Sequence, residues 1–164
     1  MTKGEILKSL YEEALEHLEA GDYDGAVSAL QKYLRDNPTD AMAYNKLGVA
    51  FAKRQNRIEA KYYFEEALKY DVHLVHALNN LGNIAREEGN LEQAVDYYQK
   101  AIEIDPTYAL PHNNLSVIYK QLRCYGDFVR EIKTAKRLEN RKVLSPKGKA
   151  FLSWLKGLWT KPTE

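Results

Sequence analysis

The sequence predicts an all-α fold in which helix hairpins stack into an array, and two observations lead to this prediction. A 34-residue period is visible, because residues 41–74 align with 75–108 without a gap. Small residues also recur at fixed places, since Gly48 falls on Gly82 and Ala60 on Ala94. This period is typical of helical repeats, in which one hairpin cannot bury its own apolar stripe and several must stack. The 164 residues, 45% apolar and 29% charged, suit one soluble globular or repeat domain.

The period divides the chain into four hairpins, which span residues 7–40, 41–74, 75–108 and 109–142. Helix signals support this division in the first hairpin. Thr2 and Glu5 form a capping box, and the predicted helix runs to about Ala20. Asp22 is placed to cap a second helix, which should end before Pro38.

Two hairpins depart from the pattern. Val72 stands where the second helix of the following repeat ends at a proline, and we still expect a helix end there, because Asp71 and a β-branched residue disfavour its continuation. In the fourth hairpin, Phe128 takes a position that alanine occupies elsewhere. We expect this ring to push the last hairpin apart and shift its second helix.

The third repeat resembles the tetratricopeptide repeat family. The residues that carry the resemblance are Leu81, Gly82, Ala94, Tyr98, Ala101 and Pro106. The resemblance implies a right-handed superhelix, or α-solenoid, in which Gly82 faces Ala94 so that the two backbones approach closely. It also implies a protein that acts by binding other proteins on the concave side of the array.

In such an array the first helix of each hairpin lines the concave side, and its inward positions predict a peptide-binding groove. The predicted groove residues are Asn45, Lys46, Val49, Lys53, Asn79, Asn80, Asn83, Arg86, Asn113, Asn114, Val117 and Lys120. Amide side chains both donate and accept, so a row of asparagines suits the backbone of an extended peptide. Further along the same helices, Lys53, Arg86 and Lys120 would attract an acidic segment. Alternatively, the asparagines reflect helix-start chemistry, and both interpretations remain open.

Charge is distributed unevenly around a net charge of +1. Residues 1–119 hold 12 basic and 19 acidic residues, whereas residues 120–164 hold 12 and 4, which indicates an interaction made by the tail. We predict that residues 143–164 contain a basic amphipathic capping helix, which starts at Ser145 and ends at Pro162. Its apolar side consists of Phe151, Leu152, Trp154, Leu155, Leu158 and Trp159.

An apolar side of this size must be buried against another surface, and three such surfaces remain possible. The helix can cap the last hairpin, as solenoids require. It can lie on a membrane surface, because paired tryptophans with flanking lysines are typical of interfacial helices. It can also contact another protein chain, including a second copy of this one.

Signatures of catalysis and metal binding are missing from the sequence. There is no glycine-rich phosphate loop, no CxxC and no HExxH. His73 and His76 are three residues apart but have no further ligands beside them, and Cys124, the single cysteine, has no partner. Some related repeats hold the acidic C-terminal tails of chaperones with a two-carboxylate clamp that needs basic residues at fixed repeat positions. Those basic residues are missing here, whether the clamp is taken to start in the first or in the second repeat. We therefore expect no enzymatic activity, no cofactor and no metal.

The expected function is that of an adapter that captures a peptide segment of a partner protein in a preformed groove. The alternative is a peripheral membrane adapter that is anchored by the tryptophan-rich basic helix. Nucleic-acid binding is the weakest interpretation, because the basic residues are spread over two helices. Acidic residues interrupt the N-terminal region where a signal peptide needs an apolar core, and no apolar run could span a bilayer, so we expect a cytoplasmic protein.

Overall fold

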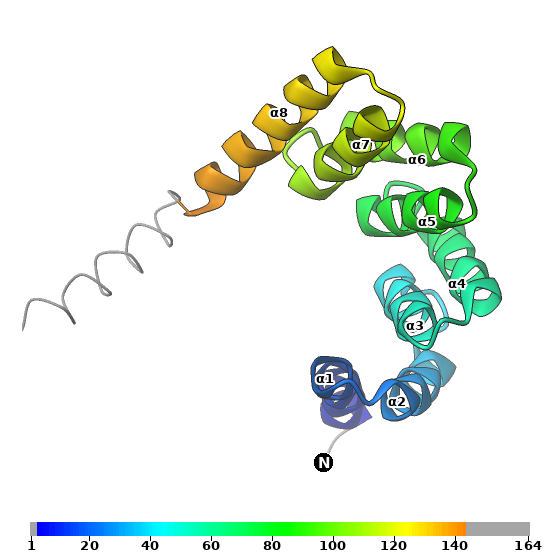
Figure 1. Ribbon diagram of the computed structural model, residues 1–164. Coiled ribbons are helices and arrows are strands. Elements are labelled where there is room, and N and C mark those ends of the chain that lie inside the picture. Colours follow the sequence, from blue (N-terminus) through cyan, green and yellow to red (C-terminus); the bar gives the residue numbers. More distant parts are fainter. Residues whose placement is uncertain (1–2, 144–164) are drawn as a thin grey trace, which may run out of the picture. The chain divides into compact units, whose positions relative to one another are not determined.

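The computed structural model describes residues 3–143 and, between residues 7 and 141, their side chains. This part of the chain consists of eight helices joined by short turns, which confirms the predicted all-α fold (Figure 1). None of these helices is both long and apolar enough to cross a membrane. The predicted C-terminal helix, with Phe151, Trp154, Leu155, Leu158 and Trp159, lies outside the described residues.

The chain divides into two compact units, residues 1–105 and 106–164. The first unit contains three hairpins, formed by α1 (Lys3–Ala20) with α2 (Tyr23–Asp36), α3 (Ala41–Lys53) with α4 (Arg57–Tyr70), and α5 (Val75–Glu87) with α6 (Leu91–Ile104). The second unit contains one hairpin, formed by α7 (Ala109–Gln121) and α8 (Tyr125–Val143). The helix end at Ala20 and the helix start after Asp22 agree with the capping signals.

Each hairpin turns at the same repeat position, where the backbone is left-handed. Glycine occupies this position in two hairpins, as Gly21 with φ 79° and Gly89 with φ 81°. In the others it is held by Gln55 with φ 60° and Arg123 with φ 61°. A side chain in this conformation is strained, so these turns are imposed by the packing of the helices on either side.

The core of the first unit joins neighbouring hairpins. One buried cluster combines Ala26 and Leu30 of α2 with Ala43 and Leu47 of α3. Another combines Phe64 of α4 with residues of α5. Each hairpin therefore buries its apolar stripe on the next one, as stacking requires.

Two glycines on first helices receive an aromatic ring. A Cβ at Gly82 would lie 2.5 Å from the ring of Tyr98, and one at Gly48 would lie 2.5 Å from the ring of Phe64. The side chain nearest to Gly82 is thus Tyr98, which lies one helical turn after Ala94 on α6; that Gly82 faces Ala94 stays a prediction. The ring of Tyr98 is fully buried and fills the space that the missing side chain of Gly82 leaves.

The second helix of the fourth hairpin packs differently from that of the third. In α6 the buried side chains are Ala94, Tyr98 and Ala101. In α8 the buried stripe is Glu131, Ala135 and Leu138, whereas Phe128 is only half-buried. Ala135, which aligns with Ala101, is buried in both helices, whereas Phe128 and Ile132, which align with Ala94 and Tyr98, are only half-buried. That the ring of Phe128 causes this difference stays a prediction.

Candidate peptide-binding surface

The predicted groove residues of the first unit lie on α3 and α5, and they differ in exposure. Asn45 and Asn79, which occupy the same repeat position, are buried at 3% and 4% exposure. Lys46, Asn80 and Asn83 are half-buried. A ligand on this surface would therefore meet the half-buried residues before it met either buried asparagine.

An amide pair ties the two first helices together. Asn80 Nδ2 donates a hydrogen bond of 3.0 Å to Asn45 Oδ1, across the interface between α3 and α5. Because Asn45 is buried, this bond satisfies an acceptor that would otherwise be lost from water. Asn45 and Asn80 thus hold neighbouring repeats in register, and one amide bond leaves Asn80 with further hydrogen-bonding capacity.

A second polar group forms where α5 meets α6. The Tyr98 hydroxyl donates to Asn83 Oδ1 at 2.8 Å, and Arg86 lies beside the same hydroxyl. Burial raises the pKa of Tyr98 above its ordinary value, although the cation of Arg86 opposes the rise. Within the described residues, the buried Nε of Arg86 has no hydrogen-bond partner. Arg86 therefore keeps donor capacity on α5.

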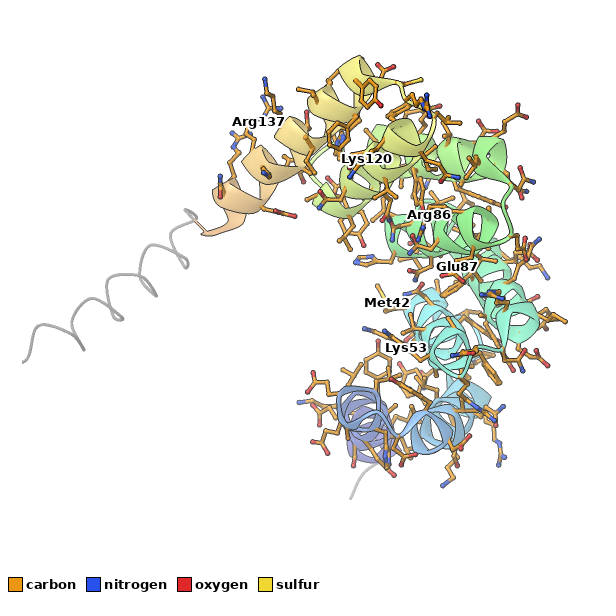
Figure 2. The ribbon with its side chains drawn as sticks, in the orientation of Figure 1. Met42, Lys53, Arg86, Glu87, Lys120 and Arg137 are labelled. Carbon is orange, nitrogen blue, oxygen red and sulfur yellow. The ribbon has the colours of Figure 1, made fainter. Side chains whose placement is uncertain are left out.

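On the first helices α3 and α5 taken together, there are three basic residues and one acidic residue. α3 contains Lys46 and Lys53 and no acidic residue. α5 contains Arg86 and one acid, Glu87, whose carboxylate accepts from Arg57 Nε at 3.0 Å. Figure 2 labels Lys53 and Arg86 on these two successive first helices. The acidic residues that dominate the net charge of this unit therefore lie elsewhere.

The predicted residues of the second unit lie on α7. Asn113 Nδ2 donates to Glu139 Oε1 of α8 at 2.8 Å, so its amide ties the hairpin together. Asn114 is half-buried, whereas Val117 and Lys120 are exposed. Figure 2 labels Lys120. α7, like α3, contains no acidic residue.

One buried polar pair in the second unit was not predicted. His112 Nδ1 lies 2.7 Å from Glu131 Oε2, and both side chains are about nine-tenths buried. Arg130 Nε donates to the other oxygen of Glu131 at 3.1 Å. The pair crosses from α7 to α8, so the spacing of residues within one helix does not reveal it.

A concavity in the first hairpin was also not predicted. It has a volume of about 570 Å³ and is lined by Leu7, Lys8, Tyr11, Glu12, Leu15, Tyr33 and Asn37. The signal in the sequence is the apolar spacing of Leu7, Tyr11 and Leu15, which places all three on one face of α1.

Between residues 3 and 143, no group of histidine, cysteine or acidic side chains is placed to hold a metal ion.

Three family models, each described as tetratricopeptide repeat, match residues 11–60, 75–108 and 97–127. The chain belongs to the tetratricopeptide repeat family. Membership of this family supports a protein–protein interaction module.

Curated tetratricopeptide repeat relatives match most of the chain. Small glutamine-rich tetratricopeptide repeat-containing protein 2 of Mycosarcoma maydis is 28% identical over 122 residues, which are 74% of this chain and 34% of that protein. The peroxisomal targeting signal receptor of Saccharomyces cerevisiae is 26% identical over 71% of this chain and 18% of its own length. The chain thus spans about a third or less of these two relatives.

Solved tetratricopeptide repeat structures show the same fold. The crystal structure of MamA has a TM-score of 0.71 and 22% identity, and the match covers 84% of this chain and 80% of that one. The first repeat domain of Spaghetti (RPAP3), bound to an HSP90 peptide, has a TM-score of 0.66 and 19% identity over 73% of this chain and 94% of that one.

Proposed function

We propose that this protein is a non-catalytic adapter that binds an acidic, extended segment of a partner protein on the first helices α3 and α5. The observation that carries the proposal is the charge bias of these helices. Lys46, Lys53 and Arg86 lie on them, and their single acid, Glu87, is paired with Arg57. A surface of one sign attracts and orients a partner of the opposite sign.

Amide groups supply the second part of the recognition. Asn80 and Asn83 are half-buried on α5, the helix that also carries Arg86. An amide can donate to a backbone carbonyl and accept from a backbone N–H, so these side chains suit an extended segment of varied sequence. α7 carries Asn113, Asn114, Val117 and Lys120, and offers residues of the same types within its own unit.

Similar proteins support this class of ligand. The Spaghetti structure holds an HSP90 peptide of sequence SRMEEVD, which contains three acidic residues. The yeast relative is, by its name, a receptor for a targeting signal. Because the clamp residues for chaperone tails are missing here, we propose a segment with internal acidic side chains.

The test is selection from a random peptide library on the intact protein, followed by fluorescence anisotropy with selected peptides. We expect enrichment of Asp and Glu, and affinity about tenfold lower in the Lys46→Ala/Lys53→Ala variant. The matched control is Lys61→Ala/Lys100→Ala, which removes two lysines from the second helices α4 and α6. Selected peptides without excess acid would refute the charge argument, and equal losses in both variants would refute the assignment to α3 and α5.

A further inference from the structure

The concavity of the first hairpin has apolar walls because its polar groups are already bonded. The Tyr33 hydroxyl donates to Asp40 Oδ2 at 2.8 Å, and Asn37 Nδ2 donates to the carbonyl of Tyr33 at 3.2 Å. The rings of Tyr11 and Tyr33 lie 5.1 Å apart. The ring faces and the side chains of Leu7 and Leu15 are what remains to contact a ligand. A volume of about 570 Å³ is enough for large apolar side chains.

One wall of this concavity is the acidic helix α1, which holds five glutamates against two lysines. Its exposed glutamates Glu12, Glu16 and Glu19 are called the rim. Of these, only Glu12 lines the concavity, and its Oε1 lies 3.7 Å from Lys8 Nζ. The excess of acidic residues on α1 therefore favours an apolar segment that carries positive charge.

The chain itself contains a segment of that chemistry. Residues 144–164 hold four lysines and one glutamate, so their side-chain charge is opposite and equal to that of α1. The same residues include Phe151, Trp154 and Trp159. Aromatic side chains of this kind dominate the binding energy when they fill a pocket, and the flanking lysines would meet the glutamates of the rim.

We propose that residues 144–164 of one molecule dock into the α1–α2 concavity of a second copy. The tail follows the fourth hairpin whereas the concavity belongs to the first, and two hairpins of sequence separate them. Since repeats contact their sequence neighbours, the first hairpin of another molecule is the acceptor to which we commit. The contact joins two different surfaces, so it is heterologous and extends from molecule to molecule. It uses neither Lys46, Lys53 nor Arg86, and is therefore independent of the proposed peptide binding.

The test uses three variants of the full chain in sedimentation velocity. The tail variant, Trp154→Ser/Trp159→Ser, contains no tryptophan, because the chain has only these two. The rim variant, Glu12→Lys/Glu16→Lys, changes only exposed side chains. The control, Glu92→Lys/Asp96→Lys, makes the same charge change at the same spacing on α6, again at exposed positions.

We expect the wild type and the control to associate as concentration rises, with a midpoint that moves upward in salt. The tail and rim variants should each reach half-maximal association only at a roughly tenfold higher protein concentration than the wild type. An equimolar mixture of these two variants should form one-to-one pairs, because one partner supplies the tail and the other the concavity. All tryptophan emission in that mixture comes from the rim variant, and it should shift to the blue as its tail is buried.

Each other outcome overturns the proposal. Tryptophan emission that is blue at every dilution, with a monomeric wild type, would mean that the tail docks within its own chain. Emission that shifts only with anionic vesicles would assign the tail to a membrane. A mixture that stays monomeric, or a rim variant that behaves like the control, would exclude the concavity as the docking site.

Discussion

The contact between Gly82 and Tyr98 yields a prediction of definite sign for Gly82→Ala. The new Cβ would lie 2.5 Å from Tyr98 Cε1 and 2.7 Å from Cδ1, whereas ordinary contacts begin near 3.4 Å. The ring is fully buried, and its hydroxyl donates a hydrogen bond of 2.8 Å to Asn83. A movement of the ring away from the new Cβ would therefore disturb its packing and weaken this hydrogen bond. Overpacking costs about 1–3 kcal/mol and the strained hydrogen bond about 1 kcal/mol. Alanine recovers about 1 kcal/mol of helix propensity, so we expect a net loss of about 1–3 kcal/mol.

The assay is urea unfolding followed by far-UV circular dichroism, with Gly126→Ala as the control. Gly126 lies in the first turn of α8, and a Cβ there would meet nothing within 4 Å. This substitution should therefore stabilise the chain by up to about 1 kcal/mol. Combining Gly82→Ala with Tyr98→Leu should cost less than the sum of the two single changes, because the clash disappears with the ring. If Gly82→Ala stabilises the protein as Gly126→Ala does, the ring does not rest on Gly82 and the packing argument is refuted.

Three further predictions concern the first unit. Asn80→Leu should lower the free energy of unfolding by about 1–3 kcal/mol, because it leaves the buried oxygen of Asn45 unpaired. The double variant Asn45→Leu/Asn80→Leu should lose less than this single change, and urea unfolding midpoints of the two variants measure the difference. Gln55→Gly should raise the free energy of unfolding by about 1 kcal/mol and Gly89→Ala should lower it by a similar amount, since both positions are left-handed, as thermal melts would show. Burial, followed by the hydrogen bond to a carboxylate, raises the pKa of Tyr33 to about 12, so its stabilising effect is complete below pH 10 and is lost between pH 10 and 12. The ultraviolet difference between wild type and Tyr33→Phe during an alkaline titration should show this ionisation, and a midpoint near 10 would contradict it.

The sequence predicts the hairpins well because their boundaries are set by local chemistry. Asp22 accepts from the backbone N–H of Gly25 at 3.0 Å, as a helix cap should, and Gly21 adopts the left-handed turn before it. These features depend on residues a few positions apart, so a single sequence is enough to read them.

The candidate site was harder to predict because it depends on how side chains divide between packing and solvent. The period places Asn45 and Asn80 on the inward side, but only the structure shows that they bond to each other. The His112–Glu131 pair crosses from α7 to α8 and joins residues 19 positions apart in the sequence. The concavity combines residues of α1 with Tyr33 and Asn37 of α2, so it depends on how the two helices pack. In each case the outcome depends on which neighbour is present, and a repeat pattern describes all positions as equivalent.

Opposite charges on successive first helices make the two proposed binding events separable within one protein. α1 carries an excess of glutamates, whereas α3 has lysines and no acid. Salt weakens both interactions, because both depend on exposed charges, so salt alone does not distinguish them. A polyanion such as polyglutamate competes for the basic surface of α3 and α5, but it also binds the lysines of the tail. A polycation binds the acidic rim of α1, but it also binds other exposed acidic residues and the acidic peptide itself. The variants separate the two events: loss of self-association in Glu12→Lys/Glu16→Lys with unchanged binding of a labelled acidic peptide, and the reverse in Lys46→Ala/Lys53→Ala, would require two surfaces of opposite sign on the same array.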